Sequence, residues 1–124
     1  MNWLVCGTRK KGYKELVFET LDKLRTNEQA FYRDWQPSSI IEGCCPDSAD
    51  AYAEEWATEN NIPLQHHPAT QRNYLKRNIE MVKKADKVIA FWDGYSYGTA
   101  HTIAWGTKKY IPVLIYFIKG GDLK

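Results

Sequence analysis

The stretch KVIAFWDGYSYGTAHTI, residues 87–103, contains the features that decide the fold. After its opening lysine the first segment is continuously apolar, which is typical of a strand buried on both faces. A loop with two glycines follows, and residues 98–107 then place Ala100, Ile103 and Ala104 at helical spacing. A buried strand, a glycine-bearing loop and a helix in this order indicate one strand-to-helix unit of a parallel sheet.

The same pattern recurs along the rest of the chain. Strands are expected at 2–7, 38–43, 62–67, 87–92 and 111–117, and helices at 11–26, 47–60, 70–84 and 98–107. Asp47, directly after Pro46, is a suitable N-cap for the second helix. The alternation predicts an α/β fold with a mainly parallel five-stranded sheet and helices on both faces. We expect a single domain over residues 1–118 and a flexible tail at 119–124.

The composition excludes several classes of protein. Hydrophobic residues make up 44% and charged residues 26%, as in a globular domain rather than a disordered chain. A net charge of +2 offers no broad positive field, so we expect neither nucleic acid nor an anionic membrane as a partner. The longest apolar runs are too short to span a bilayer, and from the first residues we expect no secretory signal. Three cysteines, two of them adjacent, do not form a disulfide framework, so a cytoplasmic location is expected.

Three loops follow the predicted strands at the edge where open parallel sheets bind ligands. They are Gly7-Thr8-Arg9 and the segments 43–50 and 93–99. The last two each open a helix, whose free N–H groups and dipole favour a phosphate, and their glycines permit close backbone approach. The alternative interpretation of both segments is an ordinary strand-to-helix turn.

Several motifs resemble the SLOG superfamily and, within it, the small bacterial and phage proteins of the YspA/YpsA type. The motifs are Gly7-Thr8-Arg9, GCCPDSADAYAEEWA at 43–57, Arg77-Asn78-x-x-Met81 and AFWDGYSYGTAHTI at 90–103. The resemblance covers residues 1–113. It implies a Rossmann-like, doubly wound sheet with a pocket for a nucleotide or nucleotide derivative at the same edge.

The loops and the resemblance together predict the ligand-binding residues. Arg9 and Arg77 are expected to supply positive charge. Asp93 or Asp50 is expected to bind ribose hydroxyls, and Trp92 either packs in the core or stacks on a base. The residues expected to contact phosphates are Gly43, Gly94, Ser96, Gly98 and Thr99. The other expected ligand-binding residues are Gly7, Thr8, Cys44, Ser48 and Asn78.

The first functional hypothesis is a protein without a cofactor that binds a nucleotide-derived small molecule, as a sensor or a sequestering protein. The resemblance implies an ADP-ribose-like or cyclic nucleotide signal as its ligand. The alternative is a nucleotide hydrolase that cleaves an N-glycosidic or phosphoester bond, similar to the lonely-guy phosphoribohydrolases of the superfamily. Arg77 and Asp93 are its candidate catalytic residues. In those hydrolases a Glu lies three residues after a Gly-Thr pair, where this chain has Thr102, which cannot ionise. We therefore favour binding over catalysis.

Metal and thiol chemistry are weaker alternatives. Cys44, Cys45, His66, His67 and His101 fit no usual pattern of zinc ligands, and consecutive strand residues point to opposite faces, so no metal is expected. A helix N-terminus would lower the pKa of a nearby thiol, but the sequence places no base beside one.

Aromatic residues exceed what a small core requires. Tyr95 and Tyr97 lie in a loop, and Trp105 lies off the predicted inward face of its helix. Exposed aromatic side chains are favoured at protein interfaces, so we expect a homo-oligomer, a dimer or larger, with the ligand near the subunit junction. The alternative is a monomer whose loop aromatics close over the ligand.

Overall fold

The computed structural model describes residues 1–69 and 73–119. Its elements in chain order are β1 (Asn2–Gly7), α1 (Lys14–Gln29), β2 (Ser39–Glu42), α2 (Ala49–Glu59), β3 (Leu64–His66), α3 (Tyr74–Lys84), β4 (Lys87–Trp92), α4 (Tyr97–Lys108) and β5 (Val113–Phe117). The predicted order of strands and helices is confirmed, although several ends differ by a few residues. Residues 70–72 of the expected third helix and residues 120–124 of the expected tail lie outside the described residues.

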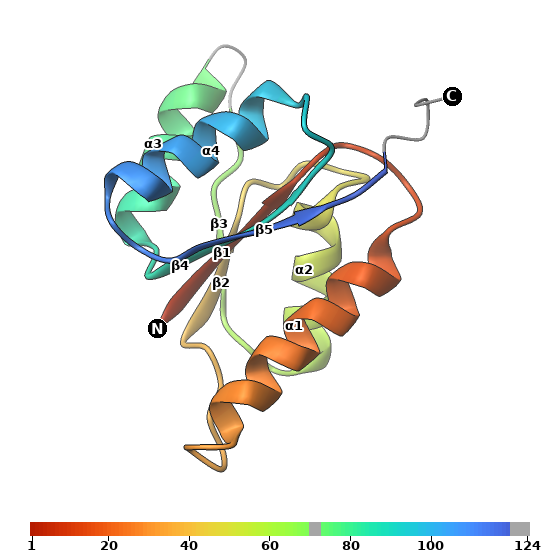
Figure 1. Ribbon diagram of the computed structural model, residues 1–124, viewed down its shortest axis with the longest axis vertical. Helices are drawn as coiled ribbons and strands as arrows, with labels where there is room; N and C mark the ends of the chain where they lie inside the picture. The colour runs from red at the N-terminus through yellow and green to blue at the C-terminus, as the bar shows by residue number, and fades with distance from the viewer. Residues whose placement is uncertain (70–72, 120–124) are drawn as a thin grey trace.

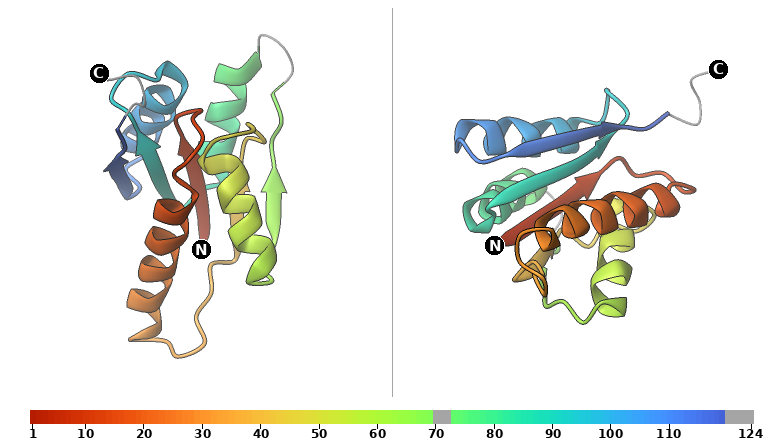
Figure 2. Two further views of the ribbon diagram at one scale, coloured as in Figure 1. Left: turned by 90° about the vertical axis from the view of Figure 1, so that its right-hand side faces the viewer. Right: turned by 60° about the horizontal axis from the view of Figure 1, so that its bottom comes forward.

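The strands form one all-parallel sheet in the order β3-β2-β1-β4-β5. Helices α1 and α2 cover one face and α3 and α4 the other, as Figures 1 and 2 show. The chain builds outward from β1 to β3 and then returns to add β4 and β5 on the opposite side. This confirms the Rossmann-like α/β fold and places the topological switch point between β1 and β4, where open sheets bind ligands. None of the helices in the described part of the chain combines the length and apolar character that crossing a bilayer requires.

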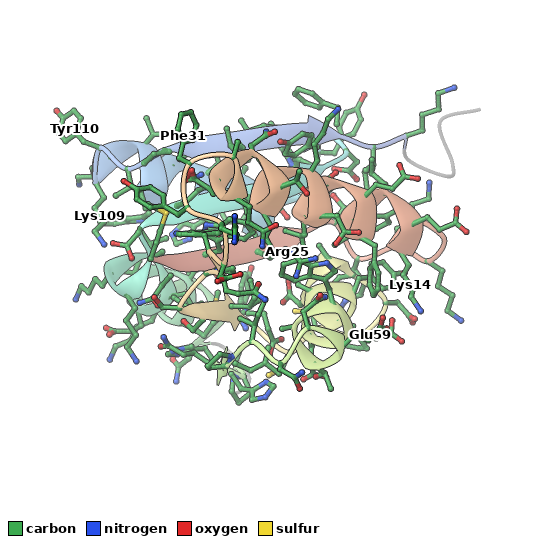
Figure 3. The ribbon with its side chains drawn as sticks, turned by 90° about the horizontal axis from the view of Figure 1, so that it is seen from below. Lys14, Arg25, Phe31, Glu59, Lys109 and Tyr110 are labelled. Atoms are coloured by element: carbon green, nitrogen blue, oxygen red, sulfur yellow. The ribbon has the colours of Figure 1, made fainter. Side chains whose placement is uncertain are left out.

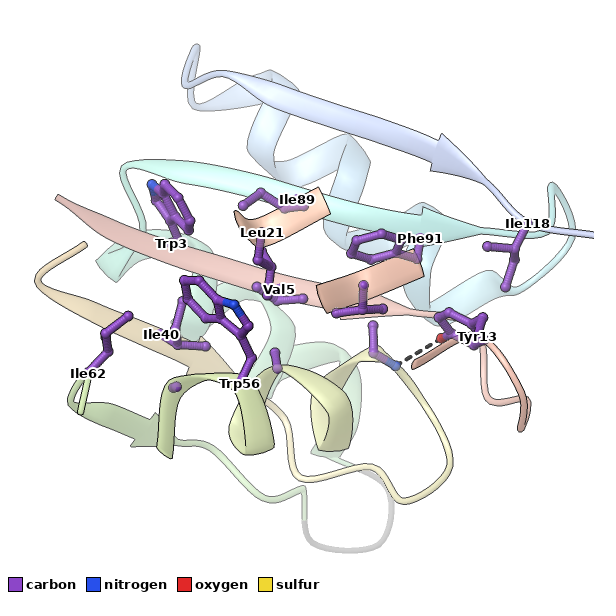
Figure 4. Packing of buried hydrophobic residues seen from close by; sticks show 14 residues of the cluster. Trp3, Val5, Tyr13, Leu21, Ile40, Trp56, Ile62, Ile89, Phe91 and Ile118 are labelled. Carbon is purple, nitrogen blue, oxygen red and sulfur yellow. Dashed lines mark hydrogen bonds between the residues drawn. The ribbon is translucent and has the colours of Figure 1, made fainter. Parts of the chain in front are cut away.

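Alternate residues of the central strands divide between two cores. Trp3 of β1 faces α1 and α2, where its ring lies 6.3 Å from that of Trp56, and both side chains are buried (Figure 4). Leu4 and Ile41 face α3 and α4 in the second core. Burial of each such large side chain contributes about 1.5–3 kcal/mol, which fixes the sheet and therefore the loops at its edge.

Two local expectations are wrong. The N-cap of α2 is Ser48, whose Oγ accepts a hydrogen bond from the Asp50 amide, whereas Asp47 adopts a left-handed φ of 49° in the preceding turn. The buried residues of α4 are Thr99, Thr102 and Gly106, while Ala104 is exposed. Small residues face the sheet because the helix lies close to it: a methyl group at position 106 would lie 2.9 Å from Val113.

The end of the molecule opposite the switch point is held by Lys109, which follows α4. Its Nζ donates hydrogen bonds of 2.8–2.9 Å to the carbonyls of Val82, Lys83 and Ala85 at the C-terminus of α3. Figure 3 shows Lys109 beside Tyr110, with Lys14 of α1 at the far end. These bonds tie α3 to α4, the two helices that border the candidate site.

Candidate functional site

A cavity of about 530 Å³ lies at the C-terminal ends of β1 and β2, between the starts of α3 and α4. Most of the predicted ligand-binding residues line it: Gly7, Arg9, Gly43, Cys44, Asp50, Arg77, Asn78, Ser96, Gly98 and Thr99. The rest of its lining was not predicted to bind a ligand: Cys6, Cys45, Pro46, Pro68, Ala69, Tyr74, Met81 and Thr102. Contact of these residues with a ligand remains a prediction.

The lining of the cavity does not include the remaining predicted residues, which are Thr8, Ser48, Trp92, Asp93 and Gly94. Most of them instead hold the loops around the cavity in place. Thr8 Oγ1 accepts a hydrogen bond from the Asp93 amide at 3.1 Å, which ties the loop after β1 to the loop after β4. The Trp92 indole donates to the Ser96 carbonyl, and its ring lies 6.0 Å from that of Phe117. Trp92 therefore packs between its own loop and β5.

The loop after β4 is held by one carboxylate and leaves its helix uncapped. Asp93 Oδ1 accepts hydrogen bonds of 2.8 Å from the amides of Tyr95 and Ser96. Desolvation would raise the pKa of Asp93, but these hydrogen bonds hold it below its ordinary value. Ser96 is the N-cap of α4, yet its side chain makes no hydrogen bond to the first amides of the helix. Gly98 and Thr99 of that first turn line the cavity, so the positive end of the α4 dipole is directed at it.

The loop after β2 is instead filled by the protein's own carboxylates. Asp50 Oδ2 accepts hydrogen bonds from the amides of Gly43 at 3.1 Å and Cys45 at 3.3 Å. Glu42 Oε1 accepts one from the Cys44 amide at 2.6 Å. Three successive amides in the segment predicted to favour a phosphate, of which Gly43 was the predicted contact, are therefore already satisfied. The α2 N-terminus is closed as well, because the Ala49 amide donates to the Tyr13 hydroxyl (Figure 4).

Burial makes Asp50 an unusual acid within this loop. Desolvation raises its pKa to about 6; the charge of Glu42 adds to that rise, while the Cys45 hydrogen bonds and Arg77 oppose it. Two buried carboxyl groups therefore flank the loop after β2: Asp50 in the first turn of α2, which lines the cavity, and Glu42 at the end of β2. A phosphate placed there would meet negative charge instead of free donors.

Arg77 of α3 reaches across the end of the sheet to the same loop. Its Nη1 donates to the carbonyls of Gly43 at 2.6 Å and His67 at 2.9 Å, and its Nε donates to Asn78 Oδ1. At position 43 an added methyl group would lie 2.8 Å from the Arg77 Cζ, so a larger residue there would displace the guanidinium from these carbonyls. Arg77 therefore joins β2, β3 and α3 in addition to presenting charge to the cavity.

The thiol of Cys44 does not have the properties expected of a nucleophile. Burial and the neighbouring charge of Glu42 raise its pKa to about 11, opposite to the effect of a helix dipole. The Cys44 thiol is therefore protonated at neutral pH, which argues against this residue as a nucleophile.

An all-parallel sheet with a cavity at its topological switch point defines a protein of Rossmann-like fold. The model of the YspA, cpYpsA-related SLOG family matches residues 1–74, and the chain belongs to this family. No curated protein and no solved structure matches it. The matched region contains β1, β2, β3 and the loops after β1 and β2, whereas the loop after β4 lies beyond it.

Two residues near the site, Tyr13 and Glu42, were not predicted from the sequence as part of it. Tyr13 bridges the loops after β1 and β2, donating to the Thr8 carbonyl and accepting from the Ala49 amide. Glu42 ends β2 beside His66 of β3 in the parallel register. The available signal was a glutamate at the end of an otherwise apolar strand, which predicts a buried carboxylate in need of partners.

Proposed function

We propose that this protein binds a nucleotide-derived small molecule, an ADP-ribose-like or cyclic nucleotide signal, in the cavity at the switch point, as a sensor or sequestering protein. The observation that carries the proposal is the uncapped N-terminus of α4 opening on a cavity of about 530 Å³. Such a helix end supplies both free N–H donors and a positive dipole, which together suit a phosphate. Membership of a nucleotide-related family supports the same ligand class.

In this proposal the phosphate lies at the first turn of α4, beside Ser96, Gly98 and Thr99, rather than in the loop after β2. Arg9 is exposed and lines the cavity, so it adds charge without a structural task of its own in the sheet. Tyr74 is 41% exposed and is the aromatic side chain among the described lining residues, so it takes the base-stacking role first considered for Trp92.

Calorimetry with AMP, ADP-ribose, NAD and cyclic ADP-ribose isomers tests this proposal. We expect at least one of them to bind with a dissociation constant well below millimolar. Arg9→Ala and Tyr74→Ala should each weaken that binding, because they remove a charge and a stacking surface. Lys11→Ala, an exposed residue two positions after Arg9, is the matched control. Absence of binding by all four ligands contradicts the proposal, as does equal weakening by the control.

A specific observation also favours the alternative, a nucleotide hydrolase. Asp50 lines the cavity, and its pKa of about 6 is suited to proton transfer near neutral pH. Against it, Asp93 is occupied in its own turn, and the Thr102 hydroxyl donates to the Gly98 carbonyl. Release of base or phosphate that Asp50→Asn abolishes, with nucleotide binding retained, would establish the hydrolase. Binding without turnover supports the first proposal.

We also propose that the protein forms a homo-oligomer, at least a dimer. Tyr95 and Tyr97 beside the cavity are 75% and 65% exposed, and Phe117 on the edge strand β5 is 70% exposed. Trp105, in contrast, is partly buried against the core beneath α3 and α4, so it does not belong to this exposed set. Light scattering at micromolar concentration should give at least twice the 14.4 kDa mass of one chain. A monomer mass that ligand leaves unchanged contradicts the proposal.

A further inference from the structure

Three side chains of different chemistry converge beside the cavity, at the C-terminal ends of β2 and β3. Glu42 is the last residue of β2, His66 is its parallel neighbour at the end of β3, and Cys44 follows Glu42 by two residues. The Cys44 Sγ lies 3.6 Å from both the Glu42 Oε2 and the His66 Nδ1. The His66 Nδ1 contacts the same Glu42 oxygen. One sulfur, one nitrogen and one oxygen are therefore within 4.8 Å of one another.

We propose that Glu42, Cys44 and His66 bind one Zn²⁺ ion. Thiolate, imidazole and carboxylate are the ligand types that zinc prefers, and zinc sites combine them in tetrahedral geometry. Zinc bonds of about 2.3 Å to sulfur and about 2.0 Å to nitrogen or oxygen place neighbouring ligand atoms roughly 3.3–3.6 Å apart. The two distances to sulfur already match this spacing. Only the contact between His66 and Glu42 has to widen, and the His66 side chain is 46% exposed and free to turn.

The fold fixes two of these ligands before any metal arrives. Glu42 is a wholly buried carboxylate, held through Oε1 by the Cys44 amide, so its Oε2 faces the other two groups. Cys44 has a left-handed φ of 62°, a conformation that non-glycine residues adopt rarely and that turns this thiol towards the Glu42 side chain. A strained residue beside a buried charge is a feature found at functional sites.

The surrounding charge also favours a cation. Glu54 of α2 lies 3.3 Å from His66 Nδ1, so two carboxylates face one imidazole. Arg77, on the same edge, directs its Nη1 at the carbonyls of Gly43 and His67. Three protein ligands leave a fourth position for water, Glu54 or a ligand atom. On binding, the thiol proton of Cys44 passes to solvent, and the neutral imidazole of His66 binds the metal through Nδ1 with its proton on Nε2.

This site differs from the expectation that the histidines and cysteines fit no zinc pattern. That expectation compared spacings along the chain, whereas the ligands are brought together by the register of β2 and β3. It also left out Glu42, which supplies the oxygen. The prediction that His66 and His67 face opposite ways is consistent with their surroundings. His66 meets Glu54 of α2, whereas burial and then the charge of Lys84 on α3 lower the pKa of His67.

Metal titration of the purified full chain, stripped of metal by a chelator, tests the proposal. Zinc should bind at one equivalent per chain by calorimetry. Cobalt(II), which replaces zinc and is coloured, should give a thiolate-to-cobalt charge-transfer band. Cys44→Ser and His66→Asn should each weaken zinc binding by at least about tenfold, and Cys44→Ser should abolish the charge-transfer band.

The chain contains a matched control beside two of the three ligands, because Cys45→Ser and His67→Asn change the same residue types one position away. Both controls should retain the stoichiometry and the cobalt band. Glu42→Gln is a third test, interpreted only if its circular dichroism and unfolding midpoint match those of the wild type. Absence of stoichiometric zinc binding overturns the proposal, and so does loss of the band in Cys45→Ser with retention in Cys44→Ser. None of these measurements uses a nucleotide, so the result stands apart from that of the proposed function.

Discussion

The loop after β2, residues 43–48, and the loop after β4, residues 93–96, both join the C-terminal end of a strand to the N-terminus of a helix. In the first, Glu42 and Asp50 turn their carboxylates onto the backbone amides, and Ser48 caps the helix. In the second, Asp93 accepts hydrogen bonds from the amides of its own turn, and the first turn of α4 has no side-chain cap. A helix N-terminus is therefore available to an anion only where the protein's own oxygens leave it free.

The largest expected effect separates the two loops by their response to pH. The folded-state pKa of Asp50 is raised from 3.8 to about 6. Its contribution to the free energy of unfolding is therefore most favourable below pH 4 and is lost as the pH rises through 6. This loss amounts to roughly 2 kcal/mol between pH 4 and pH 7. Urea unfolding at both pH values should show it as a change in the stability difference between the wild type and Asp50→Asn.

Asp93 provides the opposite case. Its folded-state pKa is lowered. Its stabilising contribution to the free energy of unfolding is therefore present above the ordinary carboxyl pKa and is lost as the pH falls through the folded-state pKa. The stability difference between the wild type and Asp93→Asn should therefore grow as the pH rises. Equal pH dependence of the two variants would contradict the contrast between the loops.

The same substitution should have opposite effects on stability in the two loops. Gly43→Ala places a methyl group against the Arg77 guanidinium and should cost roughly 2 kcal/mol of unfolding free energy. Gly98→Ala meets no heavy atom within 4 Å and lies in a helix, so it should stabilise by up to about 1 kcal/mol. Because this methyl group enters the cavity, Gly98→Ala should also weaken nucleotide binding, by about tenfold. Thermal unfolding and calorimetry on the two variants measure both effects.

The smallest effect concerns the two N-cap serines. Ser48→Ala removes the cap of α2 and should cost about 1 kcal/mol. Ser96→Ala removes a hydroxyl that bonds Thr8 but no cap, so its cost should be lower, about 0.5 kcal/mol. The difference in unfolding midpoint between these variants tests whether the two helix ends are capped differently; equal losses would contradict it.

The fold was predictable from sequence because its signals are local. Apolar runs such as 87–92 and the helical spacing of apolar residues gave all the strand and helix positions in the described chain, and β1 and β4 have the predicted bounds. Helix ends were less predictable. Asp47 and Ser48 are both good capping residues, and only the backbone path, with its left-handed φ at Asp47, selects Ser48.

The position of the candidate site was predictable from the sequence. The different roles of the loops after β2 and β4 were not. Sequence alone assigned the two loops the same task, since both contain glycine and precede a helix. The difference depends on where the side chains of Glu42 and Asp50 turn, and on the pairing of β2 with β3 that brings His66 to Glu42. These are contacts between residues separated in the chain, which spacing does not reveal. The same applies to Trp92, whose partner Phe117 comes from β5.

In the proposed function, phosphate binds at the first turn of α4 and not in the loop after β2. Backbone amide NMR of the ¹⁵N-labelled protein titrated with AMP tests it most directly. We expect the amide protons of Gly98 and Thr99 to move downfield in a saturable way, as hydrogen bonds to an anion require. Those of Gly43, Cys44 and Cys45 should move little. Downfield shifts concentrated at residues 43–45, with Gly98 and Thr99 unchanged, would contradict it.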